Sequence, residues 1–173
     1  MTIPASIQSD LGAIRILVLD FDGVMTDNSV ITRQDGQESV VCSRSDGLGI
    51  GMVRDAGVEV VVISMEENPV VKARCDKLKI ECTHGHKHKL PVLAALLERK
   101  GIHPRHAMYV GNDVNDIPCL GHVGLGVAVA DAHEAVFRHA RVVTKKPGGR
   151  GAVREVVDWL LDARGVDPYG ART

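Results

Sequence analysis

Short apolar runs alternate with longer amphipathic stretches along the chain, a pattern typical of βα units packed around a parallel sheet. Residues 14–19, 58–63 and 107–110 are nearly continuous apolar runs, so we expect them to be strands buried on both faces. Residues 124–128 and 141–144 are weaker strand candidates. Between the runs we expect helices at about 46–56, 68–78, 87–100, 114–121, 132–138 and 151–164. The pattern predicts an α/β fold with a central parallel sheet flanked by helices.

One segment interrupts this alternation directly after the first predicted strand. Residues 29–42 hold two β-prone arms around Asp35-Gly36, a dipeptide that favours a tight hairpin turn. We therefore predict a β-hairpin over about residues 28–42 that projects from the sheet.

Nothing in the sequence suggests a second domain. The chain has 173 residues, the usual size of one domain, and it shows no internal repeat, low-complexity tract or linker. We therefore expect residues 1–173 to form a single domain with its core over about 13–164. The two end segments, 1–12 and 165–173, are expected to be loosely held.

Composition and charge exclude several classes of protein. Hydrophobic residues make up 45% and charged residues 25% of the chain, which is ordinary for a globular protein. A net charge of −1 and an aromatic content of 3% give neither a basic patch nor stacking side chains, so we expect no nucleic-acid partner. No apolar run has the length of a membrane span, and no secretory signal is visible. Four widely spaced cysteines favour reduced thiols, so we expect a cytoplasmic enzyme or binding domain.

Two aspartates, Asp20 and Asp22, follow the first predicted strand and precede Gly23. In an open α/β sheet, sites form outside the carboxyl ends of the strands. Two carboxylates at such a place are costly unless they bind a cation or accept hydrogen bonds, and Mg²⁺ suits them because it prefers oxygen ligands. The alternative is a pair of turn-forming aspartates, because Asp favours turns generally. The longer pattern Asp-Phe-Asp-Gly-Val-Met-Thr-Asp over 20–27 is more specific than a bare pair.

The segment 20–27 resembles the first motif of the haloacid dehalogenase-like (HAD) phosphohydrolases. Three later segments agree with that family in order: Ser64 after the second strand, Lys89 at the start of a helix, and Gly-Asn-Asp-Val-Asn-Asp over 111–116. The resemblance covers about residues 13–162 and implies a Rossmann-like HAD fold. A phosphate-responsive receiver-type domain also uses acidic strand ends, but it explains neither the spacing of the aspartates nor the glycine-rich segment near the C-terminus.

The resemblance implies a phosphatase that works through an aspartyl-phosphate. Asp20 is then the nucleophile that attacks phosphorus, which divides hydrolysis into two easier steps. Asp22 is the acid that protonates the leaving alcohol and the base that activates water. Ser64 and Lys89 hold phosphoryl oxygens, although each taken alone is an ordinary strand-end hydroxyl or helix lysine. Mg²⁺, bound by Asp20, the Asp22 carbonyl and a residue of the fourth motif, offsets the repulsion between carboxylate and phosphate.

The fourth motif departs from the family pattern. It usually begins Gly-Asp, whereas this chain has Asn112 in place of the aspartate, followed by Asp113. The position makes Asn112 the expected metal ligand with Asp116 behind it, and the adjacent Asp113 is the alternative ligand. An amide oxygen can bind Mg²⁺, but the site loses one negative charge and with it affinity. A second function class therefore stays open: a catalytically weak oligomerisation domain associated with a sugar-nucleotide synthetase.

The gaps between the motifs are too short for a cap domain. The stretch from Asp27 to Ser64 holds the predicted hairpin and one helix, and the stretch from Ser64 to Lys89 has room for one helix and a short strand. The active site is therefore expected to be open in a monomer. A small phosphorylated substrate then needs another subunit to exclude water, so we expect a homo-oligomer.

The chain looks most like the capless branch of the HAD family. That branch contains the 3-deoxy-D-manno-octulosonate (KDO) 8-phosphate phosphatases, the 9-phosphate phosphatases of nonulosonates such as N-acetylneuraminate, and the C-terminal domain of some acylneuraminate cytidylyltransferases. The supporting segments are residues 45–50, 123–133 and 148–155. This resemblance implies Mg²⁺-dependent hydrolysis of a phosphorylated 2-keto-3-deoxy sugar acid, and a tetramer formed through the projecting hairpins.

Four further residues are candidate substrate contacts. KDO 8-phosphate phosphatases typically have Gly-Arg after the Ser or Thr of the second motif, whereas this chain has Met65-Glu66. Glu66 followed by Arg74 resembles the nonulosonate group, so we expect a nonulosonate 9-phosphate as substrate, with KDO 8-phosphate as the alternative. Asp46 and Arg150 are further candidates by resemblance, since the fork of an arginine suits carboxylate or phosphate. In the plain alternative these residues belong to solvated helix starts and loops.

Three histidines, His84, His86 and His88, alternate along the chain just before Lys89. In a strand all three would lie on one face and could bind a soft metal. No acidic or thiol ligand in this stretch completes such a site. We therefore expect a solvated loop rather than a built metal centre.

Overall fold

A six-stranded sheet in the order β5-β4-β1-β6-β7-β8 forms the centre of the computed structural model, which describes residues 7–167. Every pair of neighbouring strands in it is parallel. Its strands are β1 (Ile16–Leu19), β4 (Glu59–Ile63), β5 (Glu81–Thr83), β6 (Ala107–Gly111), β7 (Leu125–Ala128) and β8 (Val142–Val143). The parallel α/β sheet expected from the apolar runs is confirmed, and every residue of β1 and β6 is buried.

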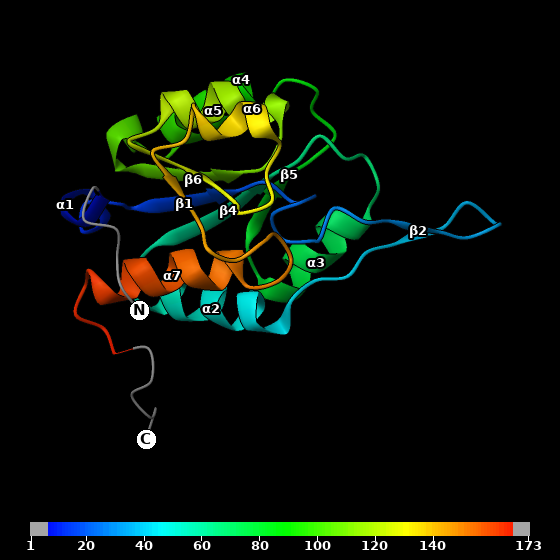
Figure 1. Cartoon of the computed structure of the whole chain (residues 1–173), viewed down its shortest axis with the longest axis horizontal. Helices are drawn as coiled ribbons and strands as arrows, with labels where there is room; N and C mark the ends of the chain where they lie inside the picture. Colours follow the sequence, from blue (N-terminus) through cyan, green and yellow to red (C-terminus); the bar gives the residue numbers. More distant parts are fainter. Residues whose placement is uncertain (1–6, 168–173) are drawn as a thin grey trace.

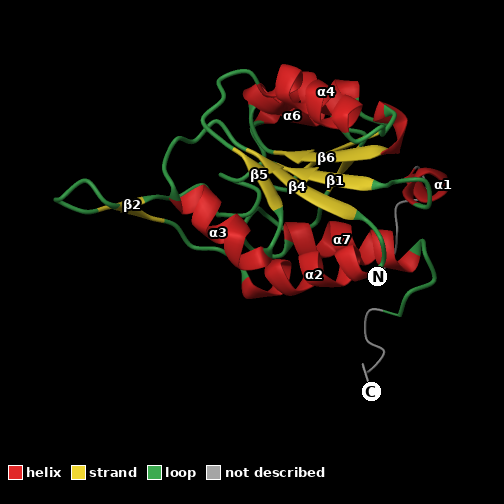
Figure 2. Cartoon of the chain, turned by 180° about the vertical axis from the view of Figure 1, so that it is seen from behind, coloured by secondary structure: helices red, strands yellow, loops and turns green. Residues whose placement is uncertain are grey.

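Helices cover both faces of this sheet, as Figures 1 and 2 show. One layer consists of α4 (Lys89–Arg99), α5 (Ile117–His122) and α6 (Glu134–Phe137). The other layer consists of α2 (Arg44–Asp55), α3 (Val70–Leu78) and α7 (Ala152–Asp162). Short 3₁₀ turns, η2 (Pro104–His106) and η3 (Val114–Asp116), precede β6 and α5. The predicted helix over 114–121 thus begins as a 3₁₀ turn, at which Asp113 and Asp116 form a reciprocal cap.

The predicted hairpin is present and projects from the body of the molecule (Figure 1). Its strands β2 (Ile31–Thr32) and β3 (Glu38–Ser39) are antiparallel. The turn between them contains Gly36 with φ of +79°, a conformation that side chains disfavour. The base of the hairpin is held to the body where Asn68 Nδ2 donates to Glu38 Oε2 at 3.1 Å.

The expectation that residues 1–12 are loosely held is wrong for part of that segment. Residues Gln8–Leu11 form a short helix, α1, and Ile7 and Leu11 are fully buried. The guanidinium of Arg164 donates to the carbonyl oxygen of Leu11 at 3.3 Å, which joins this helix to the end of α7. Residues 1–6 and 168–173 lie outside the described residues.

The order of the strands places a switch point at the carboxyl end of β1. From β1 the chain runs first to β4 on one side, and later to β6 on the other side. Loops that follow these strands diverge there and leave a crevice, which is where open α/β sheets bind ligands. In the described part of the chain, no helix is both long enough and apolar enough to cross a membrane.

Candidate active site

The loop after β1 brings Asp20 and Asp22 to the switch point of the sheet. The backbone N–H of Asp20 still donates to the Val110 carbonyl on β6 at 3.0 Å, so this residue leaves the strand in a fixed position. The Phe21 carbonyl then accepts three successive backbone N–H groups, which closes a tight turn. Gly23 has φ of +81° in this turn, so the glycine of the motif is required by the backbone.

A buried threonine holds the same turn from within. Thr26 Oγ1 accepts the backbone N–H of Gly23 at 3.1 Å and that of Asn28 at 3.3 Å. The motif comparison matches Thr26 to no catalytic role and predicts only that it forms hydrogen bonds within the loop, which these contacts confirm. The structure shows that its hydroxyl fixes the backbone directly after Asp22.

Lys89 lies at the first position of α4 and reaches under the cavity with a buried side chain. Its Nζ is 2.7 Å from Asp20 Oδ1 and 2.8 Å from Asp116 Oδ1. Lys89, the residue of the third motif, therefore contacts Asp20 of the first motif directly. The solvated helix lysine that stood as the plain alternative is excluded for this residue.

Burial and nearby charge shift the titration of this pair. Burial, and then the neighbouring Asp116, raise the pKa of Asp20 to about 8, although Lys89 opposes them. Burial disfavours the charged form of Lys89, but Asp20 and Asp116 outweigh it and raise the pKa of the ammonium above its ordinary value. Lys89 is thus a permanent cation, and one cation does not balance two buried carboxylates.

Asn112 supplies the side chain next to the second oxygen of Asp20. One terminal atom of its buried amide lies 3.2 Å from Asp20 Oδ2 and 2.9 Å from the Asp22 carbonyl oxygen. An NH₂ group in that position donates to both oxygens, whereas an amide oxygen there requires a cation between the three. The donor set of one carboxylate, one amide and one carbonyl fits a hard divalent ion. Among the described residues, no three or more His, Cys, Asp or Glu side chains are placed so that they could hold a metal ion.

The adjacent Asp113 is engaged as a helix cap. Its Oδ1 accepts the backbone N–H of Val114 at 2.6 Å at the start of η3. Asp116 is fully buried, and its Oδ2 accepts the N–H groups of Asn112 at 2.9 Å and Asp113 at 3.3 Å. Asn112 thus lies beside Asp20 Oδ2 while Asp113 caps η3, and which of the two binds a metal stays a prediction.

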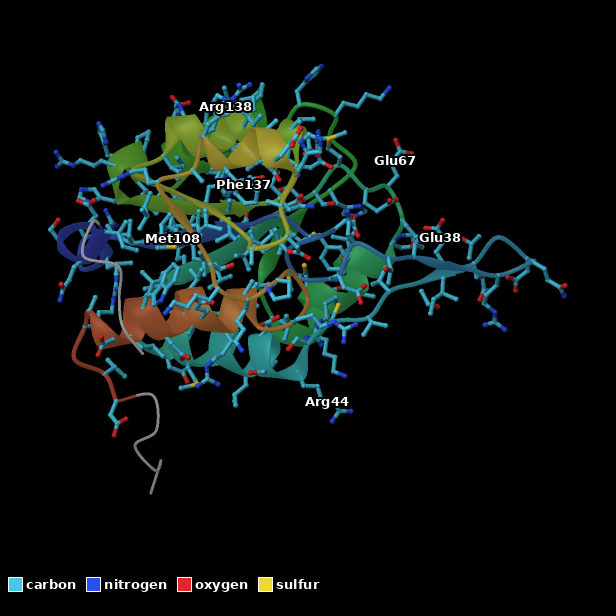
Figure 3. All side chains as sticks on the ribbon, viewed as in Figure 1. Glu38, Arg44, Glu67, Met108, Phe137 and Arg138 are labelled. Carbon is cyan, nitrogen blue, oxygen red and sulfur yellow. The ribbon has the colours of Figure 1, made fainter. Side chains whose placement is uncertain are left out.

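Ser64 directly follows β4 and is buried, and it lines the same cavity as Asp20. Its backbone N–H donates to the Thr83 carbonyl at 3.0 Å, and its Oγ accepts the N–H of Glu66 at 3.1 Å. The loop that follows lies on the same side of the molecule as the base of the hairpin, where Figure 3 shows Glu67 and Glu38. The hydroxyl of Ser64 keeps its proton available for a ligand.

These side chains face one open cavity of about 580 Å³, a size usual for small-molecule sites. Its lining residues are Asp20, Asp22, Asn28, Ser64, Met65, Glu66, Glu67, Lys87, Lys89, Asn112, Asp113, Val114 and Asn115. Among the polar residues of this lining, motif reasoning missed Asn28, Glu67, Lys87 and Asn115. Asn28 and Asn115 are adjacent to or inside quoted motifs, whereas no pattern distinguished Lys87 from other loop lysines.

Asp46 and Arg74, two of the candidate substrate contacts, do not line this cavity. Asp46 is buried between α2 and α7, and its Oδ1 accepts the backbone N–H of Arg154 at 2.8 Å. Arg74 packs across Gly47 of α2 and donates to the Ser43 carbonyl at 3.0 Å. Within one chain both side chains connect helices, and their role toward a substrate stays a prediction.

Glu66 and Arg150, the other two candidates, are placed differently. Glu66 lines the cavity, half-buried, while its Oε1 accepts the N–H of Asn68 at 2.7 Å. Arg150 lies outside the cavity lining and forms an ion pair with Asp27 at 2.8 Å. The exposed Arg150 therefore contacts the far end of the first motif, not the reacting centre of its own chain.

The histidines before Lys89 are separated from one another by their contacts. His84 Nδ1 lies 3.2 Å from the Glu66 carbonyl oxygen, and His86 lines a second cavity beside α4. All four cysteines of the chain are described and free. Residues 84–88 form a loop, and the expectation that they build no metal centre stays a prediction.

Comparison with known proteins gives consistent matches. The sequence profile of a family described as haloacid dehalogenase-like hydrolase matches residues 67–156. The 3-deoxy-D-manno-octulosonate 8-phosphate phosphatase KdsC of Escherichia coli K12 is 43% identical over 155 residues, which cover 88% of this chain and 81% of that protein. KdsC of Yersinia pestis is 38% identical over 154 residues, which cover 87% and 81%.

Solved structures match with the same breadth. The phosphatase of this name from Yersinia pestis has a TM-score of 0.91 and 34% identity, and the match covers 94% of this chain and 89% of that one. The enzyme from Moraxella catarrhalis, in complex with magnesium, phosphate and KDO, has a TM-score of 0.89 and 29% identity, with 92% of each chain covered. The cobalt-bound enzyme from Haemophilus influenzae has a TM-score of 0.87 and 32% identity, covering 90% and 92%.

Proposed function

The chain belongs to the family of HAD-like hydrolases that contains the KDO 8-phosphate phosphatases, and on this premise we propose that it is a Mg²⁺-dependent phosphatase of a phosphorylated 2-keto-3-deoxy sugar acid. The observation that carries the proposal is the environment of Asp20. One of its oxygens is 2.7 Å from the Lys89 ammonium, and the other faces the Asn112 amide. A carboxylate held in this way at a strand end is oriented for attack on phosphorus.

In the first step, an oxygen of Asp20 forms a bond to phosphorus while the bond from phosphorus to the sugar oxygen breaks. Asp22 gives its proton to that leaving oxygen. Burial, and then the nearby Glu66, raise the pKa of Asp22 above its ordinary value, so the carboxyl keeps a proton to higher pH. The direction of this shift suits a general acid.

In the second step, water attacks the phosphorus of the aspartyl-phosphate. Asp22, now a carboxylate, takes a proton from the water, and the bond between Asp20 and phosphorus breaks. Lys89 and the Ser64 hydroxyl hold phosphoryl oxygens in both steps, because both lie at the same cavity wall as Asp20. Inorganic phosphate then leaves, and Asp20 is restored as a carboxylate.

The residues present fit a divalent cation between Asp20, the Asp22 carbonyl and Asn112. Their oxygen atoms converge. The pKa of Asp20 is raised, and additional positive charge beside this carboxyl group would lower that pKa. When bound, Mg²⁺ offsets the repulsion between the Asp20 carboxylate and the phosphate. The Moraxella relative holds magnesium, and the Haemophilus relative holds cobalt.

KDO 8-phosphate is the first candidate substrate. The curated relatives reported above are KDO 8-phosphate phosphatases, and the Moraxella structure holds KDO and phosphate. The comparisons therefore support the alternative in the sequence interpretation better than the nonulosonate 9-phosphate that we expected first.

A nonulosonate 9-phosphate is the second candidate, and Glu66 is the observation that favours it. This carboxylate lines the cavity at the position where KDO 8-phosphate phosphatases typically carry arginine. A carboxylate accepts hydrogen bonds from hydroxyl or amide groups of a longer sugar chain, but it repels the substrate carboxylate.

The test is phosphate release from KDO 8-phosphate and from N-acetylneuraminate 9-phosphate, side by side, with Mg²⁺ and with EDTA. A preference for the eight-carbon substrate supports the first candidate, and a preference for the nine-carbon substrate supports the second. If EDTA abolishes release from both, the requirement for a divalent ion is established. Absence of metal-dependent release from either substrate sinks the proposed function and favours a catalytically weak oligomerisation domain.

A further inference from the structure

We propose that Tyr109 is a positioning residue for phosphoryl transfer, because its phenol holds Asp116, and Asp116 in turn holds the Lys89 ammonium against Asp20. The residue belongs to β6 and lies beneath the cavity without lining it. This inference rests on the proposed phosphatase function. It adds to that function a residue that no motif distinguishes.

A continuous set of hydrogen bonds leads from the phenol to the nucleophile. Tyr109 Oη donates to Asp116 Oδ1 at 2.8 Å, and Lys89 Nζ donates to the same oxygen at 2.8 Å. From there Lys89 Nζ reaches Asp20 Oδ1 at 2.7 Å. The side chains of Tyr109, Asp116 and Lys89 are buried, so water does not replace any member of the set.

The sheet explains why the anchor comes from Tyr109. Its backbone is in register with Val18 of β1 and Gly126 of β7, so it lies in the middle of the sheet. Asp116 belongs to the short turn η3, and Lys89 has a flexible four-carbon side chain. Because the phenol holds Asp116 and Asp116 holds Lys89, both side chains are fixed relative to β6.

The two oxygens of Asp116 have separate tasks. Oδ2 accepts the N–H groups of Asn112 and Asp113 and so joins the turn to the metal-ligand loop. Oδ1 has Tyr109 and Lys89 as partners. Without the phenol, Oδ1 becomes a stronger acceptor for Lys89 alone, and the ammonium moves away from Asp20 and the phosphoryl group. Gly111 permits this arrangement, because a Cβ there would overlap the Asp116 side chain.

The test is Tyr109→Phe, which removes one oxygen atom and keeps the ring. We expect kcat for p-nitrophenyl phosphate and for KDO 8-phosphate to fall about tenfold, with each KM within about twofold of wild type. We expect kcat to fall while KM stays nearly constant, because Lys89 stabilises charge that develops in the transition state. A loss of packing alone would lower the melting temperature without this split.

Thr144→Val is the matched control. Thr144 is also buried, and its hydroxyl accepts the N–H of Ala130 at 3.1 Å and donates to the Lys146 carbonyl at 2.6 Å, away from the cavity. This change also removes a buried hydroxyl at constant shape. Its melting temperature is expected to fall as in Tyr109→Phe, with kcat unchanged.

The outcomes separate this inference from the proposed function. If wild type hydrolyses p-nitrophenyl phosphate but not KDO 8-phosphate, the first candidate substrate is wrong. Wild type and Tyr109→Phe can then still be compared with p-nitrophenyl phosphate as substrate. Equal kcat for wild type and Tyr109→Phe overturns the inference while the proposed function stands. If wild type hydrolyses neither compound, a crystal structure of the variant decides. In that case the role in phosphoryl transfer falls with the proposed function, and Lys89 Nζ displaced from Asp20 supports only the role of Tyr109 in positioning Lys89, whereas Lys89 unmoved between Asp20 and Asp116 overturns that role too.

Discussion

Among the single residues of the cavity, Asp20 occupies the least favourable electrostatic position. Burial and Asp116 raise its pKa from 3.8 to about 8. Between these two pH values, the folded metal-free protein keeps a proton on Asp20 that the unfolded chain has released. Since the native state binds more protons across this window, its stability falls as pH rises through it.

This linkage predicts the behaviour of Asp20→Asn. Because the amide does not titrate, we expect the melting temperature of the metal-free variant to fall less steeply between pH 5 and pH 8 than that of wild type. Thermal unfolding followed by circular dichroism in EDTA measures both slopes. Equal slopes for the two proteins would show that Asp20 does not carry the raised pKa.

The same substitution tests the nucleophile. An amide cannot form the aspartyl-phosphate, so Asp20→Asn is expected to lower the rate of phosphate release about 10⁴-fold or more. Phosphate release with Mg²⁺ measures the loss, and the melting curve at pH 7 shows that the variant is folded. Substantial remaining turnover by a folded variant is incompatible with this mechanism.

Asn112 allows a prediction about the metal. Asn112→Asp restores a negative charge beside Asp20 Oδ2, which lies 3.2 Å from the Asn112 amide. We expect the Mg²⁺ concentration for half-maximal activity to fall about tenfold, and the metal-free protein to melt at lower temperature because a second acidic group is then buried beside Asp20 without a cation.

Asn115→Asp is the control for that experiment. Asn115 lies on the same loop and lines the cavity, but its amide contacts the Met65 sulfur at 2.9 Å rather than Asp20. A charge placed there changes the general potential of the cavity without adding a ligand. An equal decrease in the required Mg²⁺ concentration for both variants would argue against Asn112 as a ligand.

At the scale of elements, the loop that precedes α7 supports the loop that follows β1. The Gly149 N–H donates to the Val24 carbonyl at 2.9 Å. A Cβ on Gly149 would overlap the backbone of Thr26 and Asp27, and one on Gly148 would overlap the Gly23 carbonyl oxygen. The turn that carries Asp22 is therefore packed closely against the backbone of the loop that precedes α7.

Gly149→Ala measures this support, with Gly165→Ala as its control. Both glycines have a left-handed backbone, with φ of +63° and +65°, but a Cβ on Gly165 meets nothing within 4 Å. The control is expected to lose about 1–2 kcal/mol from the backbone alone. Gly149→Ala should lose more free energy of unfolding than this and should also lower kcat. If denaturant titrations show the same loss of free energy of unfolding for both variants, the close packing around Gly149 contributes little to stability.

At the scale of the whole molecule, the hairpin is the most unusual surface. Val30, Ile31 and Val41 are 54%, 59% and 56% exposed, respectively. A two-stranded hairpin is marginal by itself, and exposed apolar clusters mark contact surfaces. Both facts agree with the homotetramer implied by the family resemblance, which stays a prediction.

Light scattering after size exclusion tests the oligomer. Wild type is expected to elute as a tetramer, and Ile31→Lys as a smaller species, because a charge in an apolar contact is costly to bury. Gln34→Lys, at the exposed and polar end of the hairpin, adds the same charge and should leave the mass unchanged. A monomeric wild type would contradict the prediction.

Local signals in the sequence predicted a large part of this molecule. Apolar runs indicated the strands and Asp35-Gly36 indicated the hairpin, while the resemblance to the HAD family placed Asp20, Ser64 and Lys89 at strand ends or a helix start. These features depend on neighbours within a few positions, so they are readable from the order of residues. The short helix α1 was missed because its stability comes from burial of Leu11 and not from its own four residues.

The sequence by itself therefore determined the order of elements, the hairpin and the edge of the sheet at which the acidic motifs meet. Only the tertiary structure decided which side chains contact one another at that edge. Asp46 accepts a hydrogen bond from Arg154, 108 positions away, instead of facing the cavity. Lys89 joins Asp20 to Asp116, and Tyr109 supports Asp116 from inside the sheet. Such contacts depend on distances between elements, and no local pattern of residues encodes those distances.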